Sequence, residues 1–285
     1  MNNRQIAARE GLRGALEVRK MLNLGYSQFV CVFDAAERLG LEVRFLGGSS
    51  FEGMYSRSKQ TILVPSLRPQ GRQAFACSHE LGHWYFGHGS KLEDLESLEL
   101  GNSLDQEDHI ANVFAGYFLA TPWAVKAAFQ IRKWEIQNCT PVQIFSISNQ
   151  FGMGYQSLIR HMQYSVQLIS RAKAEELLKW TPQKIRFEIF GSQSDGHLVI
   201  ADLAWRDIAI DLRVGDSAIV PHGSKLDKEI LTVVNEFPNG IRMVAREPGI
   251  TRISCEPNWS SYIRISKMGF EGRSVYRHLE DCDED

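Results

Sequence analysis

The segment His79-Glu80-Leu81-Gly82-His83 contains the residues of this chain that are best suited to chemistry. On a helix, two histidines four residues apart project their imidazoles from the same face. Neutral imidazoles in that arrangement can share one zinc ion at about 2.0–2.1 Å. Glu80 is displaced around the helix, so we expect it to accept a proton from water rather than to bind the ion. The motif predicts a zinc centre, and the alternative is a surface helix that contains these residues by chance.

A catalytic zinc site needs a third protein ligand and one open position. Residues 104–112 supply acidic candidates, and on a helix Asp108 shares one face with Ala111, Asn112 and Ala115. The two alanines would let this helix approach the motif helix near Gly82, where a glycine otherwise costs about 1 kcal/mol relative to alanine. This arrangement favours Asp108 as the third ligand and leaves Glu107 as the main alternative.

Three other residues near the motif fit structural roles better than chemical ones. His109 would point to solvent if the small face of its helix is the contact face. His88 lies five residues beyond His83 and past a glycine, which favours a structural role or, at best, support for a ligand. Cys77 is expected to be a small core residue rather than a thiolate that caps the ion.

The elements that must position these residues follow from hydrophobic periodicity and turn residues. Helices are expected at residues 4–24, 29–39, 71–86 and 104–119, and a further one from Pro122. Strands are expected at residues 41–45, 53–55 and 61–64. Beyond a linker at residues 180–182, short alternating runs from 184 to 267 predict a series of strands.

The strand Thr61-Ile62-Leu63-Val64 directly precedes the motif helix, and we expect it to be an edge strand. The open edge of a sheet can bind an extended peptide through main-chain hydrogen bonds. These four residues are therefore candidates for substrate binding. The alternative is an ordinary sheet edge that other parts of the chain cover.

Composition limits the function classes. The chain has 285 residues and a formal net charge of −2, with 44% hydrophobic and 23% charged residues. This is typical of a globular protein without overall attraction to nucleic acid. We expect a cytoplasmic location and no membrane partner, because no secretory signal or bilayer-spanning stretch is evident. The five scattered cysteines fit reduced thiols and offer no Cys-x-x-Cys metal site.

Three runs, CSHELGHWYFGH, ANVFAGYFLATP and the preceding GMY…QTILVP, together resemble the ImmA/IrrE metallopeptidases over roughly residues 10–170. The resemblance implies a gluzincin-like core and cleavage of a cognate helix-turn-helix repressor. It places metal ligands at His79, His83 and Asp108, the base at Glu80, and a supporting hydrogen bond at Asn112. It also favours the substrate-binding role of residues 61–64.

One departure from the family concerns the third ligand. The family usually has Glu where Asp108 stands in this sequence. Because Asp is one methylene shorter, the helix that carries Asp108 must lie closer to the motif helix, or Glu107 must take its place.

The expected fold class is α+β. We expect a zincin-like peptidase domain with a small sheet at residues 1–139 and a helix-turn-helix-like extension packed on it at 140–180. In the extension Gln156, Ser157, Arg160 and His161 give few positive charges for DNA, so packing is favoured over DNA reading. A β-rich domain follows at 183–278, with an acidic tail at 279–285. By resemblance, the β-rich domain is expected to be a sensor of the GAF-like kind that some members of the family carry.

The leading hypothesis is a site-specific zinc metallo-endopeptidase that cleaves a helix-turn-helix repressor in a stress, DNA-damage or phage-related response, with Mn²⁺ as a possible substitute for zinc. Single-stranded DNA is the first activator to consider, because aromatic residues and arginines in the β-rich domain could stack on it and follow its backbone. Ordinary sheet packing explains the same aromatic residues. The alternatives are a non-proteolytic DNA-binding or sensor protein on a peptidase scaffold, and a peptidase with broad substrates.

Overall fold

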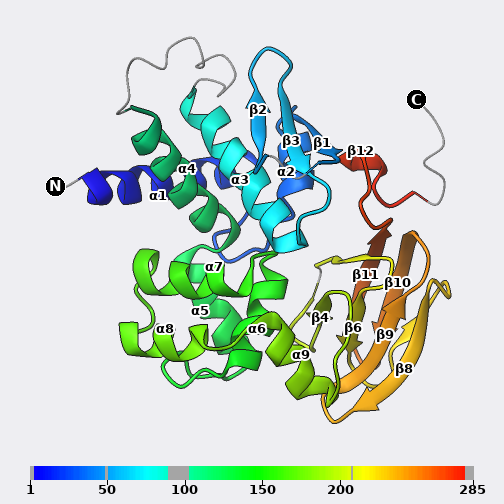
Figure 1. Cartoon of the computed structure of the whole chain (residues 1–285). Coiled ribbons are helices and arrows are strands. Elements are labelled where there is room, and N and C mark those ends of the chain that lie inside the picture. Colours follow the sequence, from blue (N-terminus) through cyan, green and yellow to red (C-terminus); the bar gives the residue numbers. More distant parts are fainter. Residues whose placement is uncertain (1–2, 49–50, 89–102, 207, 280–285) are drawn as a thin grey trace.

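The computed structural model describes residues 3–48, 51–88, 103–206 and 208–279. Figure 1 shows helices and a small sheet in the N-terminal region, a second group of helices beneath them, and a β-rich region towards the C-terminal end. The predicted α+β class is confirmed. Most of the acidic tail predicted at 279–285 lies outside the described residues.

Four helices and a four-stranded sheet form the N-terminal region. The helices are α1 (Asn3–Met21), α2 (Val32–Arg38), α3 (Gln70–Phe86) and α4 (Ser103–Leu119). The sheet has the order β12-β1-β3-β2, in which β1 is Glu42–Leu46, β2 is Met54–Ser56 and β3 is Thr61–Pro65. Apolar residues of the strands join those of the helices in one core, which includes Val43, Ile62, Leu81 and Phe114.

Strand β3 lies inside this sheet, so the prediction that Thr61, Ile62, Leu63 and Val64 form an edge strand is wrong. It pairs in parallel with β1, and its residues 61–63 also pair antiparallel with β2. Both sides of that segment are therefore occupied, and β2 is the edge strand instead. The expectation failed because the neighbours of a strand in a sheet depend on pairing that its own residues do not specify.

The strand at the opposite edge, β12 (Gly272–Arg273), comes from the C-terminal end of the chain. It pairs antiparallel with β1, with Arg273 opposite Arg44 and Gly272 opposite Phe45. Two residues are too few to show an alternating pattern, which explains why the sequence did not predict this strand. Because the C-terminal segment completes the N-terminal sheet, the division of the chain at residues 139, 180 and 278 stays a prediction.

The second group of helices comprises α5 (Pro122–Ile131), α6 (Pro141–Gln150), α7 (Tyr155–Arg160), α8 (Arg171–Leu178) and α9 (Pro182–Phe190). Three of them begin with the same dipeptide, Thr followed by Pro. The hydroxyl oxygens of Thr121, Thr140 and Thr181 each accept a hydrogen bond from the backbone N–H three residues later. The proline then occupies the first helical position, where no N–H is needed.

Helix α9 corrects the expectation of a linker at 180–182 and a strand from 184. Alternation of apolar and charged residues in this segment suggested a strand, but Thr181 caps its start and Gly191 ends it in the left-handed conformation. These two capping residues act together with Ile185, which is fully buried on the inner face of the helix. Local capping thus outweighs the period-two pattern.

Residues 140–180 pack onto the helices before them. The Tyr117 hydroxyl of α4 donates to the carbonyl of Ser165, while within the segment the Tyr155 hydroxyl donates to the carbonyl of Leu177 in α8. His161, considered above as a DNA contact, is buried with its Nε2 at 2.8 Å from the carbonyl oxygen of Ala120. Burial lowers the pKa of His161 to about 4. The likeness of this segment to a helix-turn-helix stays a prediction.

The β-rich region contains two four-stranded sheets. One has the order β5-β11-β10-β7, formed by Ile210–Arg213, Trp259–Ser266, Gly249–Cys255 and Lys225–Leu226. The other has the order β4-β6-β9-β8, formed by Leu198–Ile200, Ser217–Val220, Gly240–Ala245 and Leu231–Phe237. Trp205 and Trp259 are buried in the core between them. Phe187 and Tyr262 are exposed. A likeness to GAF domains stays a prediction.

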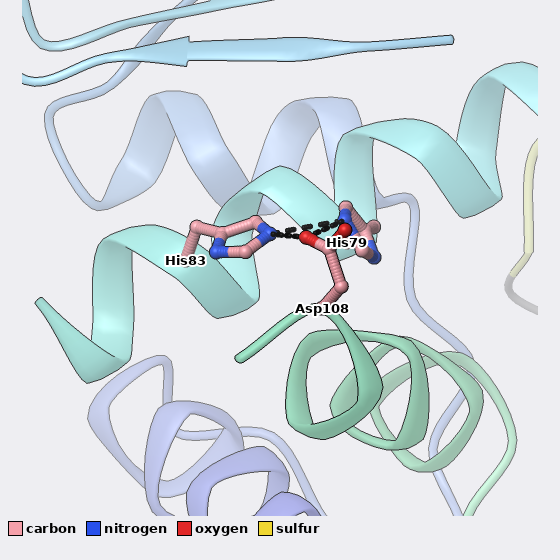
Figure 2. Close-up of side chains that lie close together, drawn as sticks. All are labelled: His79, His83 and Asp108. Carbon is pink, nitrogen blue, oxygen red and sulfur yellow. Dashed lines mark hydrogen bonds and ion pairs between the residues drawn. The ribbon is translucent and has the colours of Figure 1, made fainter. Parts of the chain in front are cut away.

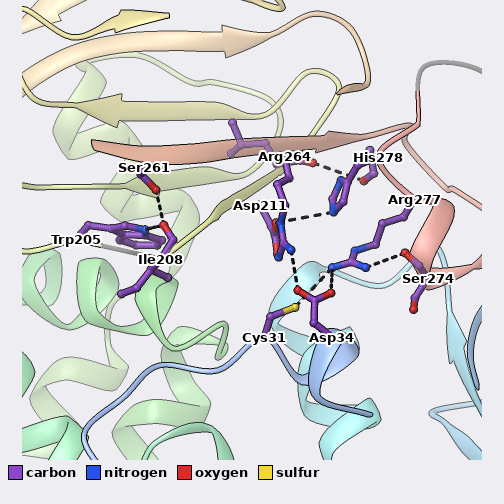
Figure 3. Close-up of polar contacts among 12 residues, drawn as sticks. Cys31, Asp34, Trp205, Ile208, Asp211, Ser261, Arg264, Ser274, Arg277 and His278 are labelled. Atoms are coloured by element: carbon purple, nitrogen blue, oxygen red, sulfur yellow. Dashed lines mark hydrogen bonds and ion pairs between the residues drawn. The ribbon is translucent and has the colours of Figure 1, made fainter. Parts of the chain in front are cut away.

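A cluster of ion pairs joins the β-rich region to the N-terminal helices (Figure 3). Arg264 of β11 donates two hydrogen bonds to Asp211 of β5, at 2.5 and 2.7 Å, and a third to Asp34 of α2 at 2.7 Å. Arg277 also donates to Asp34, at 2.7 Å. Burial alone would raise the pKa of Asp34, but the two guanidinium groups hold it well below its usual range.

No helix in the described ranges is long and apolar enough to span a bilayer.

We expect Arg264→Met to destabilise the protein by about 2–4 kcal/mol, because it leaves two partly buried carboxylates without their shared cation. Chemical unfolding monitored by circular dichroism measures the change. Arg252→Met on the neighbouring strand β10 is the matched control, since Arg252 is exposed and its side chain makes no hydrogen bond or ion pair within the described ranges. Equal stability of the two variants would contradict a role for the cluster in holding the regions together.

Candidate metal centre

The site depends on the close approach of helices α3 and α4. A Cβ atom at Gly82 would lie 3.2 Å from the Cα of Ala111 and 3.1 Å from the Phe114 ring, so only a glycine fits without a shift. The Ser78 hydroxyl, one turn earlier, lies 3.5 Å from the carbonyl oxygen of Ala115. The small face expected around Asp108 is therefore the face of α4 that contacts α3.

Three potential ligand atoms converge between these helices (Figure 2). The Nε2 atoms of His79 and His83 are 3.0 Å apart, and Asp108 Oδ1 lies 3.2 Å from Nε2 of His83 and 3.9 Å from Nε2 of His79. Ligands of a tetrahedral zinc ion with bonds of about 2.0–2.1 Å lie roughly 3.3 Å from one another. The spacing of the three atoms fits a zinc ion between them, and within the described residues these three side chains form the group suited to hold a metal.

Hydrogen bonds from behind the rings favour the tautomers that metal binding needs. His79 Nδ1 lies 3.1 Å from Asn112 Oδ1, which can only accept, so Nδ1 carries the proton and Nε2 keeps its lone pair. His83 Nδ1 lies 3.0 Å from His88 Nδ1. Burial lowers the pKa of His88, which favours the neutral ring that can accept a hydrogen bond from His83.

The position of His88 follows from the end of helix α3. Gly87 adopts a left-handed conformation with φ of 69° and terminates the helix. The N–H of His88 then donates to the carbonyl of His83, which turns the chain back over the last helical turn. His88 is thus brought beside His83, and the structure supports the ligand-supporting role rather than a purely structural one.

Glu80 lies beside the edge strand of the N-terminal sheet. Its side chain is buried, with 7% of the residue exposed. A Cβ atom at Gly53, just before β2, would lie 3.1 Å from Glu80 Oε1 and 3.4 Å from the Cβ of Ala76. The absence of a side chain at residue 53 therefore leaves room for the Glu80 carboxylate between α3 and β2.

The structure brings together His79, His83 and Asp108, and it places Asn112 behind His79. Glu107 is not part of the three-ligand group, and His109 is exposed. Cys77 is fully buried, and burial raises the pKa of its thiol well above the usual value. The strand 61–64 does not supply a free edge here. Sequence reasoning missed Gly53, and the signal that could have found it is a glycine directly before the first strand residue.

Comparison with known proteins agrees with this geometry. Residues 36–162 match the family model Peptidase_M78, described as an IrrE N-terminal-like domain. Residues 36–162 are therefore similar to the N-terminal domain of the ImmA/IrrE family, whose members the motifs of this chain resemble. The curated proteins include no match to the chain.

Among solved structures, a similar chain is described as a Mycobacterium tuberculosis transcriptional regulator. The two are 15% identical, with a TM-score of 0.37 over 57% of this chain and 52% of that one. The present chain thus spans about half the length of that relative, and so distant a likeness carries no further argument.

We expect Asp108→Ala to weaken zinc binding by about 10²-fold or more, whereas Glu107→Ala changes it little, because only Asp108 extends an oxygen towards both imidazoles. Zinc affinity can be measured by competition with a chromogenic chelator. The two variants remove adjacent carboxylates from the same helix, so each controls for the other. Loss of zinc from Glu107→Ala alone would show that α4 is rotated relative to the arrangement described.

Gly53→Ala tests the space around Glu80. The added methyl group would crowd the Glu80 carboxylate, so we expect peptidase turnover to fall by about tenfold while zinc stays bound. Gly25→Ala is the matched control, because a Cβ there would meet its nearest neighbour at 3.9 Å. Unchanged turnover in Gly53→Ala would mean that Glu80 does not act from the observed position.

Proposed function

We propose that the chain is a site-specific zinc metallo-endopeptidase. The observation that carries this proposal is the convergence of ligand atoms from His79, His83 and Asp108 next to Glu80. Two neutral imidazoles and one carboxylate suit zinc and leave a fourth position for water or substrate. Manganese is a possible substitute because carboxylate and water are also ligands that it accepts.

The residues have separate roles in hydrolysis. His79, His83 and Asp108 would hold the zinc ion, which would supply the Lewis acidity that polarises a peptide carbonyl and lowers the pKa of water. Glu80 removes the proton of the attacking water and later delivers it to the leaving amine. Asn112 and His88 fix the orientation of the two imidazole rings through their hydrogen bonds.

An extended peptide can reach this site along β2. This strand is at the edge of the N-terminal sheet, and a Cβ atom at Gly53, the residue before it, would lie 3.1 Å from Glu80 Oε1. Main-chain hydrogen bonds from β2 would hold a substrate segment in extended form beside the carboxylate. We therefore assign the substrate-binding role expected for residues 61–64 to residues 54–56, because β2 is the edge strand of this sheet among the described residues.

The proposed substrate is a cognate helix-turn-helix repressor, cleaved in a stress, DNA-damage or phage-related response. The similarity of residues 36–162 to the IrrE N-terminal-like domain supports this choice. The β-rich region is the proposed sensor. Single-stranded DNA remains the activator to test first, supported by the exposed aromatic residues Phe187 and Tyr262 near several arginines in sequence.

We expect Glu80→Gln to retain zinc and thermal stability but to lose peptide cleavage by about 10²-fold or more. The amide keeps the shape of the side chain but cannot accept the proton of water. Zinc content and cleavage of the repressor encoded next to this protein should be measured in the same preparation, with and without chelator.

Glu107→Gln provides the matched control, since it neutralises a nearby carboxylate that is neither ligand nor base. Undiminished cleavage by Glu80→Gln would remove Glu80 from its proposed role. Regulatory activity that survives both Glu80→Gln and complete removal of zinc would favour the alternative, a non-proteolytic sensor on a peptidase scaffold.

A further inference from the structure

A second site of interest lies between the β-rich region and the helices, away from the metal ligands. A cavity of about 790 Å³ is lined by residues of α3, α6, α9 and several strands of the β-rich region. None of His79, Glu80, His83 or Asp108 lines it. Its size is that of a pocket for a small molecule. Aromatic side chains such as Phe145, Phe151 and Trp205 form part of its wall.

Buried polar groups without partners face this cavity. The Ser66 hydroxyl and the Gln150 side-chain carbonyl belong to residues only 2% and 5% exposed, and neither makes a hydrogen bond within the described ranges. The Nε atom of Arg186 is also buried and without an acceptor there. Buried polar atoms are nearly always hydrogen-bonded in folded proteins. Three such groups around one cavity indicate that a polar ligand completes their hydrogen bonds.

The charges around the cavity favour an anion. Arg186 makes no ion pair among the described residues, and the guanidinium group of Arg213 donates to neutral oxygens of Arg68 and Gln73. The buried carboxylate of Asp216 accepts hydrogen bonds from the backbone N–H groups of His197 and Arg213, and its single negative charge offsets only one of the two positive charges of Arg186 and Arg213. Burial lowers the pKa of both Arg186 and Arg213, as expected for cations that are poorly solvated.

The other acidic groups of the cavity wall do not neutralise these two arginines. Asp34 and Asp211 are held by Arg264 and Arg277 in the cluster of Figure 3. Arginine side chains bind phosphate through paired charge-assisted hydrogen bonds, and an aromatic wall suits a planar ring. The combination of the two features selects a ligand that carries both a phosphate and an aromatic ring.

We propose that this cavity binds a phosphate-bearing aromatic metabolite of nucleotide size, with Arg186 and Arg213 facing the phosphate and Gln150 donating or accepting a hydrogen bond. The site is separate from the metal centre, and it would bind its ligand whether or not the peptidase proposal holds. Because Arg213 also contacts Gln73 in the first turns of α3, the ligand would lie next to the helix that carries the metal ligands.

The test is isothermal titration calorimetry of the full chain with two probes, adenosine 5′-monophosphate and phenyl phosphate. Phenyl phosphate is the minimal compound that has both features. We expect saturable binding of at least one probe at about one site per chain. Adenosine and inorganic phosphate, which each lack one feature, should bind at least about tenfold more weakly.

Substitutions locate the site. Arg186→Gln should weaken probe binding by about tenfold or more without lowering the unfolding temperature, because the Arg186 side chain makes no hydrogen bond or ion pair among the described residues. Lys184→Gln is the matched control, since it removes a positive charge from the same helix and, among the described residues, the Lys184 ammonium group donates only to the carbonyl of Lys179. Gln150→Leu should also weaken binding, while removing a buried amide oxygen that lacks a hydrogen bond within the described ranges should not lower stability.

Three results would overturn the proposal. The first is the absence of saturable binding for both probes at millimolar concentration. The second is binding that His83→Ala abolishes and Arg186→Gln leaves intact, because the phosphate would then bind at the metal centre. The third is Arg186-dependent binding of a single-stranded oligonucleotide without binding of either small probe, which would assign the surface to nucleic acid.

Discussion

The close approach of helices α3 and α4 is the constraint on which the rest of the site depends. Gly82 has no side chain, and the Cα of Ala111 occupies the place next to it. This contact brings Asp108, three residues before Ala111, within 3.2 Å of His83. An aspartate is one methylene shorter than the glutamate usual in the family, so it reaches the ligand position only because the helices are close. Gly82 therefore allows the close helix approach that the short Asp108 side chain needs to reach His83.

Residues outside the ligand set then restrict how the ligands can move. Asn112 and His88 each contact the far nitrogen of one imidazole, which sets both tautomers so that the two Nε2 atoms face the same point. Gly87 makes the contact between His88 and His83 possible, because its left-handed backbone turns the chain so that His88 lies beside the last turn of α3. Preorganised rings lose little freedom when they bind an ion, so these contacts increase affinity without touching the metal.

The sequence predicted the candidate site better than the sheet around it. The reason is that the site depends largely on spacing within single helices, whereas the sheet depends on pairing between segments that are far apart in the chain. Helical spacing alone relates His79 to His83 and Asp108 to Ala111, so local periodicity was sufficient. The place of β3 in its sheet depends on its pairing with β1 on one side and β2 on the other, and the opposite edge of the sheet is formed by β12, which lies more than 200 residues further along the chain. Helix α9 was misread as a strand because alternation was given more weight than the cap at Thr181. The sequence of this segment contains both the alternating pattern of a strand and the capping residues of a helix, and in the structure the capping residues prevail.

The β-rich region is joined to the peptidase fold by contacts too specific for an independent appendage. Strand β12 completes the sheet that carries β2, so the edge proposed to bind substrate belongs to a sheet that the C-terminal segment helps to build. Arg213 holds Gln73 at the start of α3, and Arg264 holds Asp34 of α2, which packs in the same core as α3. A ligand that shifts the β-rich region must therefore strain or release contacts on the helix that bears His79 and His83. The β-rich region could therefore act on the metal centre through α3, because Arg213 contacts the first turns of the helix that carries His79 and His83.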